Sequence, residues 1–405
     1  MDELNNDRRM KMYASPGVSL TALRTIGTRI ITKEYGELID FEAGCWAAVL
    51  GHCREEIVQV LAKNAGLLFH THQFFDTEHQ GSLVKELSEA AELGCSYKGS
   101  FLSSGSEAVA LAIALALLLT GRQKRLSLSI SGHGSSPELR FPRNPLLWVD
   151  LEVSECINCT KCSNCKECGK FVTTDFTQIA AFVFEPGNSG GLVICPPDKL
   201  INYLTEETRN AGGYVIANEI TTGFGRTGKW FGFQHYDIFN NEASAPDFIS
   251  MGKGLGNGYP ISGVLVRTSL AERVEATGYH YVQSHIDDPL GCNVARKVIE
   301  IMVRENLVAK GNTLGEYFRT QLLNIKNRTG KIDEVRGRGM MNVAVLNKTH
   351  KVKEVFIILL ELGFFVGYSE IHNLLRFYSA LTISTKEINS LCSALELILT
   401  TKDKN

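Results

Sequence analysis

Residues 250–260 have the sequence SMGKGLGNGYP, in which Lys253 stands among four glycines. The stretch overlaps the end of a short apolar strand candidate, Phe248–Ser250. A lysine that acts as a covalent nucleophile must reach its target and swing away again, and glycines give it room and permit an unusual backbone path. Because most lysines are solvated surface charges, the stretch by itself leaves that alternative open.

Helix and strand candidates alternate on both sides of this stretch from about residue 55 onward. The strands are short and continuously apolar, which is typical of a parallel sheet covered on both faces. The alternation predicts an α/β fold. The helix candidates are Arg54–Ala65, Gly81–Ala91 and Ser106–Leu119, and the further strand candidates are Ala181–Phe184, Tyr214–Ala217 and Gly263–Val266.

The two ends of the chain have a different pattern. Residues 1–50 contain short strand-like pieces, Thr28–Thr32 and Glu37–Phe41. After about residue 295 the pattern changes to a helix, short strands and a final helix near Lys386–Thr400, which predicts a smaller α+β unit. A length of 405 residues fits roughly two or three domains.

Composition narrows the class of protein. Apolar residues make up 44% of the chain and charged residues 21%, with a net charge of −2, so neither nucleic acid nor an acidic membrane surface is expected as a partner. The first residues, MDELNNDRRMKMY, lack the apolar core of a secretory signal, and the longest apolar stretch, Ala108–Leu119, is too short to span a bilayer. We therefore expect a cytoplasmic protein.

A candidate anion site lies at the start of the helix predicted after residue 103. Ser104 and Glu107 have the spacing of a capping box, which predicts a helix beginning here with free N–H groups and a positive dipole end. Gly105 would let the backbone approach an anion, and Ser106 adds a hydroxyl. The alternative is a well-capped core helix without a ligand.

A second candidate region, ANEITTGFGRTG at residues 217–228, directly follows the strand Tyr214–Ala217. Ligands of parallel sheets bind beyond the carboxyl ends of the strands, so Asn218 is well placed to meet a ring nitrogen. Together these segments resemble the class III aminotransferases, which are pyridoxal-phosphate enzymes of fold type I. The resemblance runs from about Ile39 to Thr400, and the matching motifs, in family order, are Leu50–His52, Ser104–Ala108, His133–Gly134, Phe184–Pro186, Thr222–Gly228, Lys253–Pro260, Asp288–Gly291, Gly337–Gly339 and Leu375–Phe377.

The resemblance implies an α/β fold with two domains. Residues 51–295 would form a large cofactor-binding domain with a mostly parallel sheet, and residues 1–50 and 296–405 a smaller α+β domain built from both termini. It also implies pyridoxal 5′-phosphate held through a Schiff base on Lys253, and a homodimer that shares its active sites. The cofactor-binding residues by resemblance are Gly105, Ser106, His133, Glu185, Asn218, Ile220, Thr221 and Ser284, the last supplied to the other subunit, and the substrate carboxylate would meet Arg376.

Three residues around the cofactor ring depart from the family. Asn218 replaces the aspartate that keeps the pyridine nitrogen protonated, Gly132 replaces a stacking aromatic residue, and Thr221 replaces a glutamine. The leading hypothesis is an aminotransferase that moves an amino group between an amine or amino acid and a 2-oxo acid. Asn218 leaves a racemase, epimerase or lyase open, and a cofactor-binding protein with little turnover is a third alternative.

Five of the eleven cysteines lie in one short segment, at intervals of three. The spacing resembles part of an iron–sulfur motif, and zinc also takes pairs of cysteines two residues apart. The alternative is a surface hairpin with redox-labile thiols, so iron–sulfur, zinc and no metal all stay open. The five residues are Cys156, Cys159, Cys162, Cys165 and Cys168.

Overall fold

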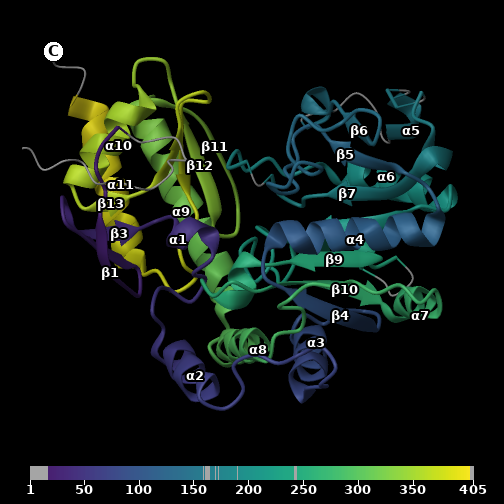
Figure 1. Cartoon of the computed structure of the whole chain (residues 1–405). Coiled ribbons are helices and arrows are strands. Elements are labelled where there is room, and N and C mark those ends of the chain that lie inside the picture. The colour runs from purple at the N-terminus through teal and green to yellow at the C-terminus, as the bar shows by residue number, and fades with distance from the viewer. Residues whose placement is uncertain are drawn as a thin grey trace, which may run out of the picture.

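The structure, a computed structural model, describes residues 17–157, 159, 165–168, 170–171, 173–188, 190–240 and 244–401. It divides into a larger part built on one wide sheet and a smaller part in which the first and last segments of the chain lie side by side (Figure 1). The smaller part therefore contains elements from both termini, as the resemblance implied. Within the described residues, every helix is too short or too polar to span a bilayer.

The wide sheet has seven strands in the order β4-β10-β9-β8-β7-β5-β6. All neighbours from β9 to β6 pair in parallel, whereas β10 runs antiparallel to both β9 and β4. Of the predicted parallel strands, Gly263–Val266 is thus the exception. The strands are β4 (Tyr97–Leu102), β5 (Lys124–Leu128), β6 (Trp148–Leu151), β7 (Ile179–Phe184), β8 (Tyr214–Asn218), β9 (Phe248–Met251) and β10 (Ser262–Arg267).

Helix α4 (Gly105–Thr120) packs along this sheet against β7, β9 and β10 (Figure 1). The predicted capping box is present, because the Ser104 side chain accepts from Glu107 N–H and the Glu107 side chain accepts from Ser104 N–H. The helix ends at Gly121, whose φ of 67° suits a glycine. Further helices of this part are α3 (Glu78–Ala90), α5 (Cys165–Cys168), α6 (Asp198–Asn210) and α7 (Thr268–Ala276).

The smaller part holds two four-stranded sheets, β1-β2-β3-β13 and β11-β12-β15-β14. In the first sheet the late strand β13 pairs in parallel with the early strand β3, which ties the two ends of the chain together. The elements are β1 (Ala22–Ile26), β2 (Arg29–Thr32), β3 (Gly36–Asp40), α1 (Ala43–Trp46), α9 (Leu307–Thr329), β11 (Ile332–Arg338), β12 (Met341–Leu346), α10 (Val352–Glu361), β13 (Phe364–Phe365), β14 (Gly367–Ser369), β15 (Leu374–Phe377) and α11 (Thr385–Thr401).

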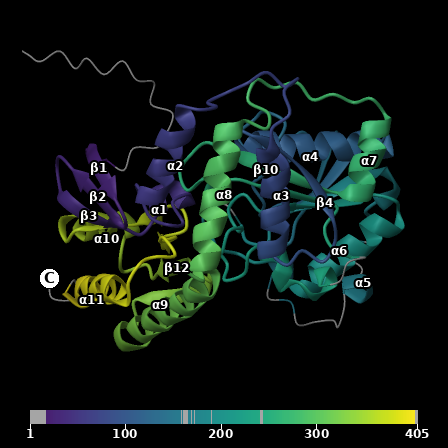
Figure 2. The ribbon, with the colours of Figure 1, turned by 90° about the horizontal axis from the view of Figure 1, so that it is seen from below.

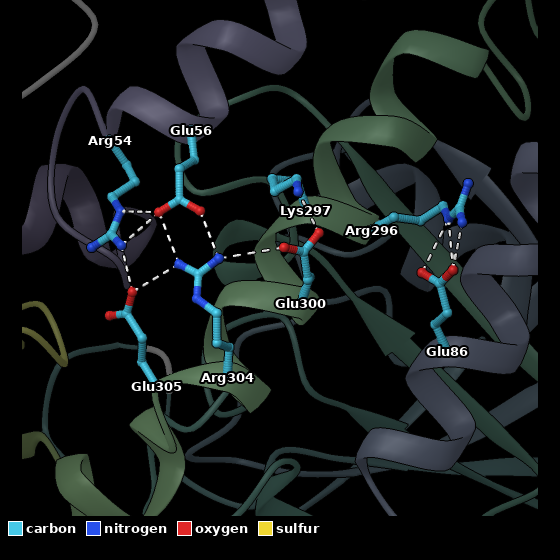
Figure 3. Close-up of polar contacts among 8 residues, drawn as sticks. All are labelled: Arg54, Glu56, Glu86, Arg296, Lys297, Glu300, Arg304 and Glu305. Atoms are coloured by element: carbon cyan, nitrogen blue, oxygen red, sulfur yellow. Dashed lines mark hydrogen bonds and ion pairs between the residues drawn. The ribbon is translucent and has the colours of Figure 1, made fainter.

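Helix α8 (Pro289–Arg304) lies between two shorter helices, α2 (Glu55–Ala65) and α3 (Figure 2). Side-chain ion pairs join it to both neighbours (Figure 3). Arg304 contacts Glu56 of α2 at 2.7 Å, and Arg296 pairs with Glu86 of α3. The domain boundary proposed at residue 296 falls inside this continuous helix.

The core of the smaller part contains an aromatic cluster that joins its N-terminal, middle and C-terminal segments. Phe41 lies 5.8 Å from Phe318 and 6.4 Å from Phe377, ring centre to ring centre, and Phe318 lies 5.1 Å from Phe377. All three side chains are fully buried. Since these rings come from β15, α9 and the residue that follows β3, they hold together segments more than 250 residues apart in sequence.

We predict that Phe318→Ala lowers the free energy of unfolding by about 3–5 kcal/mol, because it removes a fully buried ring and leaves a cavity. Leu397→Ala on α11 is the control, since Leu397 is 57% exposed and should change stability by about 1 kcal/mol or less. Chemical denaturation followed by fluorescence measures both. Equal effects of the two substitutions would contradict the role of the cluster.

Candidate active site

Three segments meet at one edge of the wide sheet. Helix α4 starts after β4, Asn218 ends β8, and Lys253 follows β9. The register between β8 and β9 pairs Asn218 with Ser250, so both strands end at the same level. Binding sites of open α/β sheets lie beyond the carboxyl ends of parallel strands, and the predicted segments converge there.

Lys253 opens a short 3₁₀ helix, Lys253–Gly256, with a φ of 41°. A left-handed backbone is costly for any residue with a Cβ, so the surrounding glycines permit this path but do not remove its strain. Its ammonium donates to the Thr221 hydroxyl at 3.0 Å. Burial lowers the pKa of Lys253 below its usual value, which favours the neutral, nucleophilic amine.

The start of α4 forms a small cradle with the turn at residues 132–135. The Ser106 hydroxyl accepts from Ser135 N–H at 3.0 Å and lies 3.3 Å from the Ser135 hydroxyl. A Cβ on Gly105 would meet the Ile220 side chain at 2.8 Å. The cradle therefore offers hydroxyls and the free N–H groups of a helix end, with Ile220 packed directly beside them.

Asn218 and His133 form one buried hydrogen-bonded group. The Asn218 amide nitrogen donates to Nδ1 of His133 at 3.2 Å and to the Gly132 carbonyl at 3.3 Å. Nε2 of His133 lies 2.7 Å from the Ser127 hydroxyl, and burial, aided by the nearby Arg143 charge, holds the pKa of His133 well below its usual value. The imidazole is thus neutral and carries its proton on Nε2.

The turn that contains Gly132 is fixed by a carboxylate. Glu185 is buried and accepts from Gly132 N–H at 2.7 Å. His133 stacks on Trp148, with 5.6 Å between ring centres and 17° between planes. Gly132 itself offers no ring, and Trp148 stacks on the histidine.

Arg376 lies on β15 and makes a two-pronged ion pair with Glu42. Its Nε donates to the Glu42 carboxylate at 3.0 Å, and its Nη2 at 2.7 Å. Glu42 is buried, and burial raises the pKa of its carboxyl against the opposing effect of Arg376. The Trp46 indole N–H also donates to Glu42, at 3.1 Å. The arginine is therefore already neutralised by an internal carboxylate.

Trp46 lies between the two cations of the site. Lys253 Nζ is 4.9 Å and Arg376 Cζ 4.8 Å from its ring centre, and Tyr378 packs against the same ring. Trp46 ends the short turn α1, in which four consecutive residues have φ between 43° and 72°. A left-handed turn of this kind is strained, and it brings the indole over both cations.

The structure brings most predicted site residues together at this edge, and it adds others. Glu42 and Ser135 were not foreseen, and Trp46 had no predicted position. Ser135 could have been suspected as a hydroxyl one residue after the His133–Gly134 motif, whereas the partner of Arg376 is 334 positions away in sequence. Ser284 is exposed, and its neighbour Gln283 donates to the Ser103 hydroxyl and to Glu107 at the start of α4.

The cysteine segment gives no support to a metal. Cys162 lies outside the described residues. Of the other four, Cys156 and Cys165 are buried, Cys159 is partly buried and Cys168 is exposed. Among the described residues these four do not form a group of three ligands close enough for one ion. Zinc and iron–sulfur are thus unsupported at this segment.

Comparison with known proteins decides the family. The family model described as aminotransferase class-III matches residues 13–399. The chain belongs to the class III aminotransferases. An acetylornithine aminotransferase of Archaeoglobus fulgidus is 30% identical over 75% of this chain and 76% of that protein. A putrescine–pyruvate aminotransferase of Pseudomonas aeruginosa is 28% identical over 85% of this chain and 82% of that protein.

Solved structures agree with the fold. An S-selective transaminase from an Arthrobacter species superposes with a TM-score of 0.86 at 21% identity, over 98% of this chain and 97% of that one. A taurine:2-oxoglutarate aminotransferase from Bifidobacterium kashiwanohense, solved with pyridoxal phosphate and glutamate, gives 0.86 at 18% identity, over 98% and 96%. The predicted fold type I architecture is therefore confirmed.

The aminotransferase depends on pyridoxal 5′-phosphate, and the residues present fit that group. The buried amine of Lys253, the cradle at Gly105 and Ser106, and the polar Asn218 with the aliphatic Ile220 would offer partners for its aldehyde, phosphate and ring. The comparisons give no support to the racemase, epimerase or lyase alternatives, or to a protein with little turnover.

We predict that Gly105→Ala weakens cofactor binding about tenfold or more, because its Cβ would push against Ile220, and overpacking costs about 1–3 kcal/mol. Gly81→Ala in α3 is the control, since a Cβ there meets nothing within 4 Å. Equilibrium titration of the apoprotein with pyridoxal phosphate measures both. Unchanged affinity in the Gly105 variant would contradict the cradle.

Proposed function

We propose that this aminotransferase binds its cofactor through Lys253, Gly105 and Ser106, and its substrates between Lys253 and Arg376. Bound pyridoxal phosphate supplies the electron-withdrawing ring on which amino groups are exchanged. Lys253 would hold the cofactor covalently and, once released, its amine would carry the proton to and from the substrate carbon. The Thr221 hydroxyl, 3.0 Å from Lys253 Nζ, orients the amine for both tasks.

Asn218 sets the charge around the cofactor ring. A neutral amide cannot hold a proton on the ring nitrogen as a carboxylate does, and the Asn218 amide nitrogen already donates to His133 and to the Gly132 carbonyl. Because His133 is also neutral, this group adds no charge beneath the ring. We infer a weaker electron sink than an aspartate would give, within the aminotransferase reaction.

Our proposal for the substrates is based on the ion pair between Arg376 and Glu42. While the ion pair is intact, the arginine charge is compensated by Glu42. An amine donor with no carboxylate near its reacting carbon would then contact the uncharged side chain of Trp46. With Glu42 displaced, Arg376 can grip the carboxylate of a 2-oxo acid in two prongs. One pocket then serves both half-reactions, with a primary amine or ω-amino acid as donor and a 2-oxo acid as acceptor.

The names of relatives support this donor class. The acetylornithine and putrescine–pyruvate aminotransferases are named for substrates that carry an amine at the end of an aliphatic chain. A transaminase of Sulfurisphaera tokodaii that is 26% identical, over 82% of this chain and 82% of that protein, is named for aminoadipate semialdehyde and glutamate semialdehyde.

We predict that Glu42→Gln lowers the KM for 2-oxo acids about fivefold, equivalent to about 1 kcal/mol, because a charged competitor for Arg376 is removed. The KM of simple amine donors should not fall. Glu37→Gln, at an exposed glutamate of β3, is the matched control. Separate half-reactions followed by cofactor absorbance give these values. A KM for 2-oxo acids that is unchanged or higher in Glu42→Gln would sink the proposal.

We also propose a homodimer that shares its active sites. Two segments, 67–75 and 281–285, expose large apolar side chains. They lie side by side, and Gln73 of the first donates to the Gln283 carbonyl of the second at 2.6 Å. Apolar surface gathered in this way is typical of interfaces. The exposed residues are Leu67, Phe69, Phe74, Phe75 and Val282. Ser284 lies on the same surface and would reach the partner's cofactor phosphate.

We predict that hybrid dimers of Lys253→Ala and Ser284→Ala chains keep roughly half of the wild-type turnover, because one of the two sites then has both residues intact. Dimers of Lys253→Ala alone should be inactive. Dimers of Ser284→Ala alone should bind the cofactor about tenfold less tightly, having lost a hydrogen bond to a charged group. Hybrids isolated through two different affinity tags are assayed at limiting cofactor. If Ser284 acts within its own chain, the hybrids will have only about half the turnover of Ser284→Ala dimers.

A further inference from the structure

Two loops meet at the start of α8 and bring His70, His285 and Asp288 together. Nδ1 of His70 lies 2.8 Å from Oδ1 of Asp288, and Nδ1 of His285 lies 3.9 Å from the same oxygen. The three ligand atoms are all within 4.8 Å of one another, and the two imidazole rings lie 4.7 Å apart, centre to centre. None of the three residues belongs to the cofactor site proposed above.

The backbone around this cluster is fixed by other contacts. Asp287 N–H donates to the Phe101 carbonyl at 2.8 Å, and Asp287 accepts from Phe101 N–H at 2.6 Å, which anchors the residue before Asp288 to β4. Asp288 is the N-cap residue of α8, yet its side chain makes no cap hydrogen bond and faces His70 instead. The carboxylate is therefore held in place and turned toward the histidines.

The cluster also borders open space. A cavity of about 250 Å³ is lined by His285 and Asp288 together with Phe69, Tyr259 and other residues. The His285 side chain is 57% exposed, whereas that of Asp288 is only 16% exposed. An ion held here would have room for water at a remaining coordination position.

We propose that His70, His285 and Asp288 bind a divalent transition-metal ion, with zinc as the first choice. Two imidazoles and a carboxylate suit zinc and its neighbours rather than calcium or magnesium, which prefer oxygen ligands. Metal–nitrogen bonds of about 2.0–2.1 Å put tetrahedral ligand atoms roughly 3.3 Å apart. The observed 2.8 and 3.9 Å fall on either side of that spacing, so an ion would draw His285 closer and move the His70 and Asp288 ligand atoms slightly apart.

The ion would join the loop around His70 to the segment that carries Ser284. Both loops also bear the exposed apolar residues of the proposed dimer surface. The site is thus structural in character: it fixes the relative position of two interface loops. Metal binding by these three side chains does not require the substrate assignment, whereas the structural role rests on the proposed homodimer.

Cobalt is the probe, because its visible absorption reports the ligands of an ion that resembles zinc. Tag-free, cofactor-loaded protein is titrated with Co²⁺, and the bands of the metal-free holoenzyme are subtracted. We expect one Co²⁺ per chain, displaced by Zn²⁺. His285→Gln and His70→Gln should each weaken binding by at least ~10-fold, whereas His280→Gln, at an exposed histidine outside the cluster, should not.

Other outcomes overturn the proposal. Absence of Co²⁺ binding would reduce the cluster to a hydrogen-bonded His–Asp pair beside a second imidazole. Equal affinity in all variants, or binding lost only in Cys156→Ser with thiolate absorption, would place the ion elsewhere. Bound-cofactor absorption and the thermal midpoint show that each variant is folded, so a loss of Co²⁺ binding is not mistaken for unfolding.

Discussion

The register between β8 and β9 is the constraint on which the active site depends. Because Asn218 pairs with Ser250, the two strands end together, and the segments that follow them leave the sheet on the same level. Lys253 then stands within hydrogen-bonding distance of Thr221, three positions beyond Asn218. A slip of one residue would turn these side chains to opposite faces and separate the amine from its hydroxyl partner.

Local features of the site could be predicted from the sequence because their causes are local. The capping box of Ser104 and Glu107 is a matter of spacing within one helical turn, and the structure has it. The continuously apolar strands predicted a sheet covered on both faces. The spacing of apolar residues and the composition could not predict that β10 runs antiparallel. Strand direction depends on the length and path of the connections, which apolar runs do not encode.

Features that join distant segments could not be predicted in this way. Nothing in the sequence near Arg376 indicates that Glu42 neutralises it, because the pair forms only when the N-terminal and C-terminal segments meet. The same holds for Trp46, which reaches the site through a strained left-handed turn that no propensity favours. The resemblance located Arg376 and Lys253, and the structure supplied the acidic and aromatic residues between them.

Arg226 links the N-terminal and C-terminal segments of the chain beside the site. This fully buried guanidinium, on the large sheet's side of the site, donates to the carbonyls of Trp46 and Ser379, which belong to opposite ends of the chain. One buried side chain therefore fastens the backbone of Trp46 to that of Ser379. By thermodynamic linkage, a ligand that contacts Trp46 and binds more tightly to this arrangement would also stabilise the contact between the N-terminal and C-terminal segments.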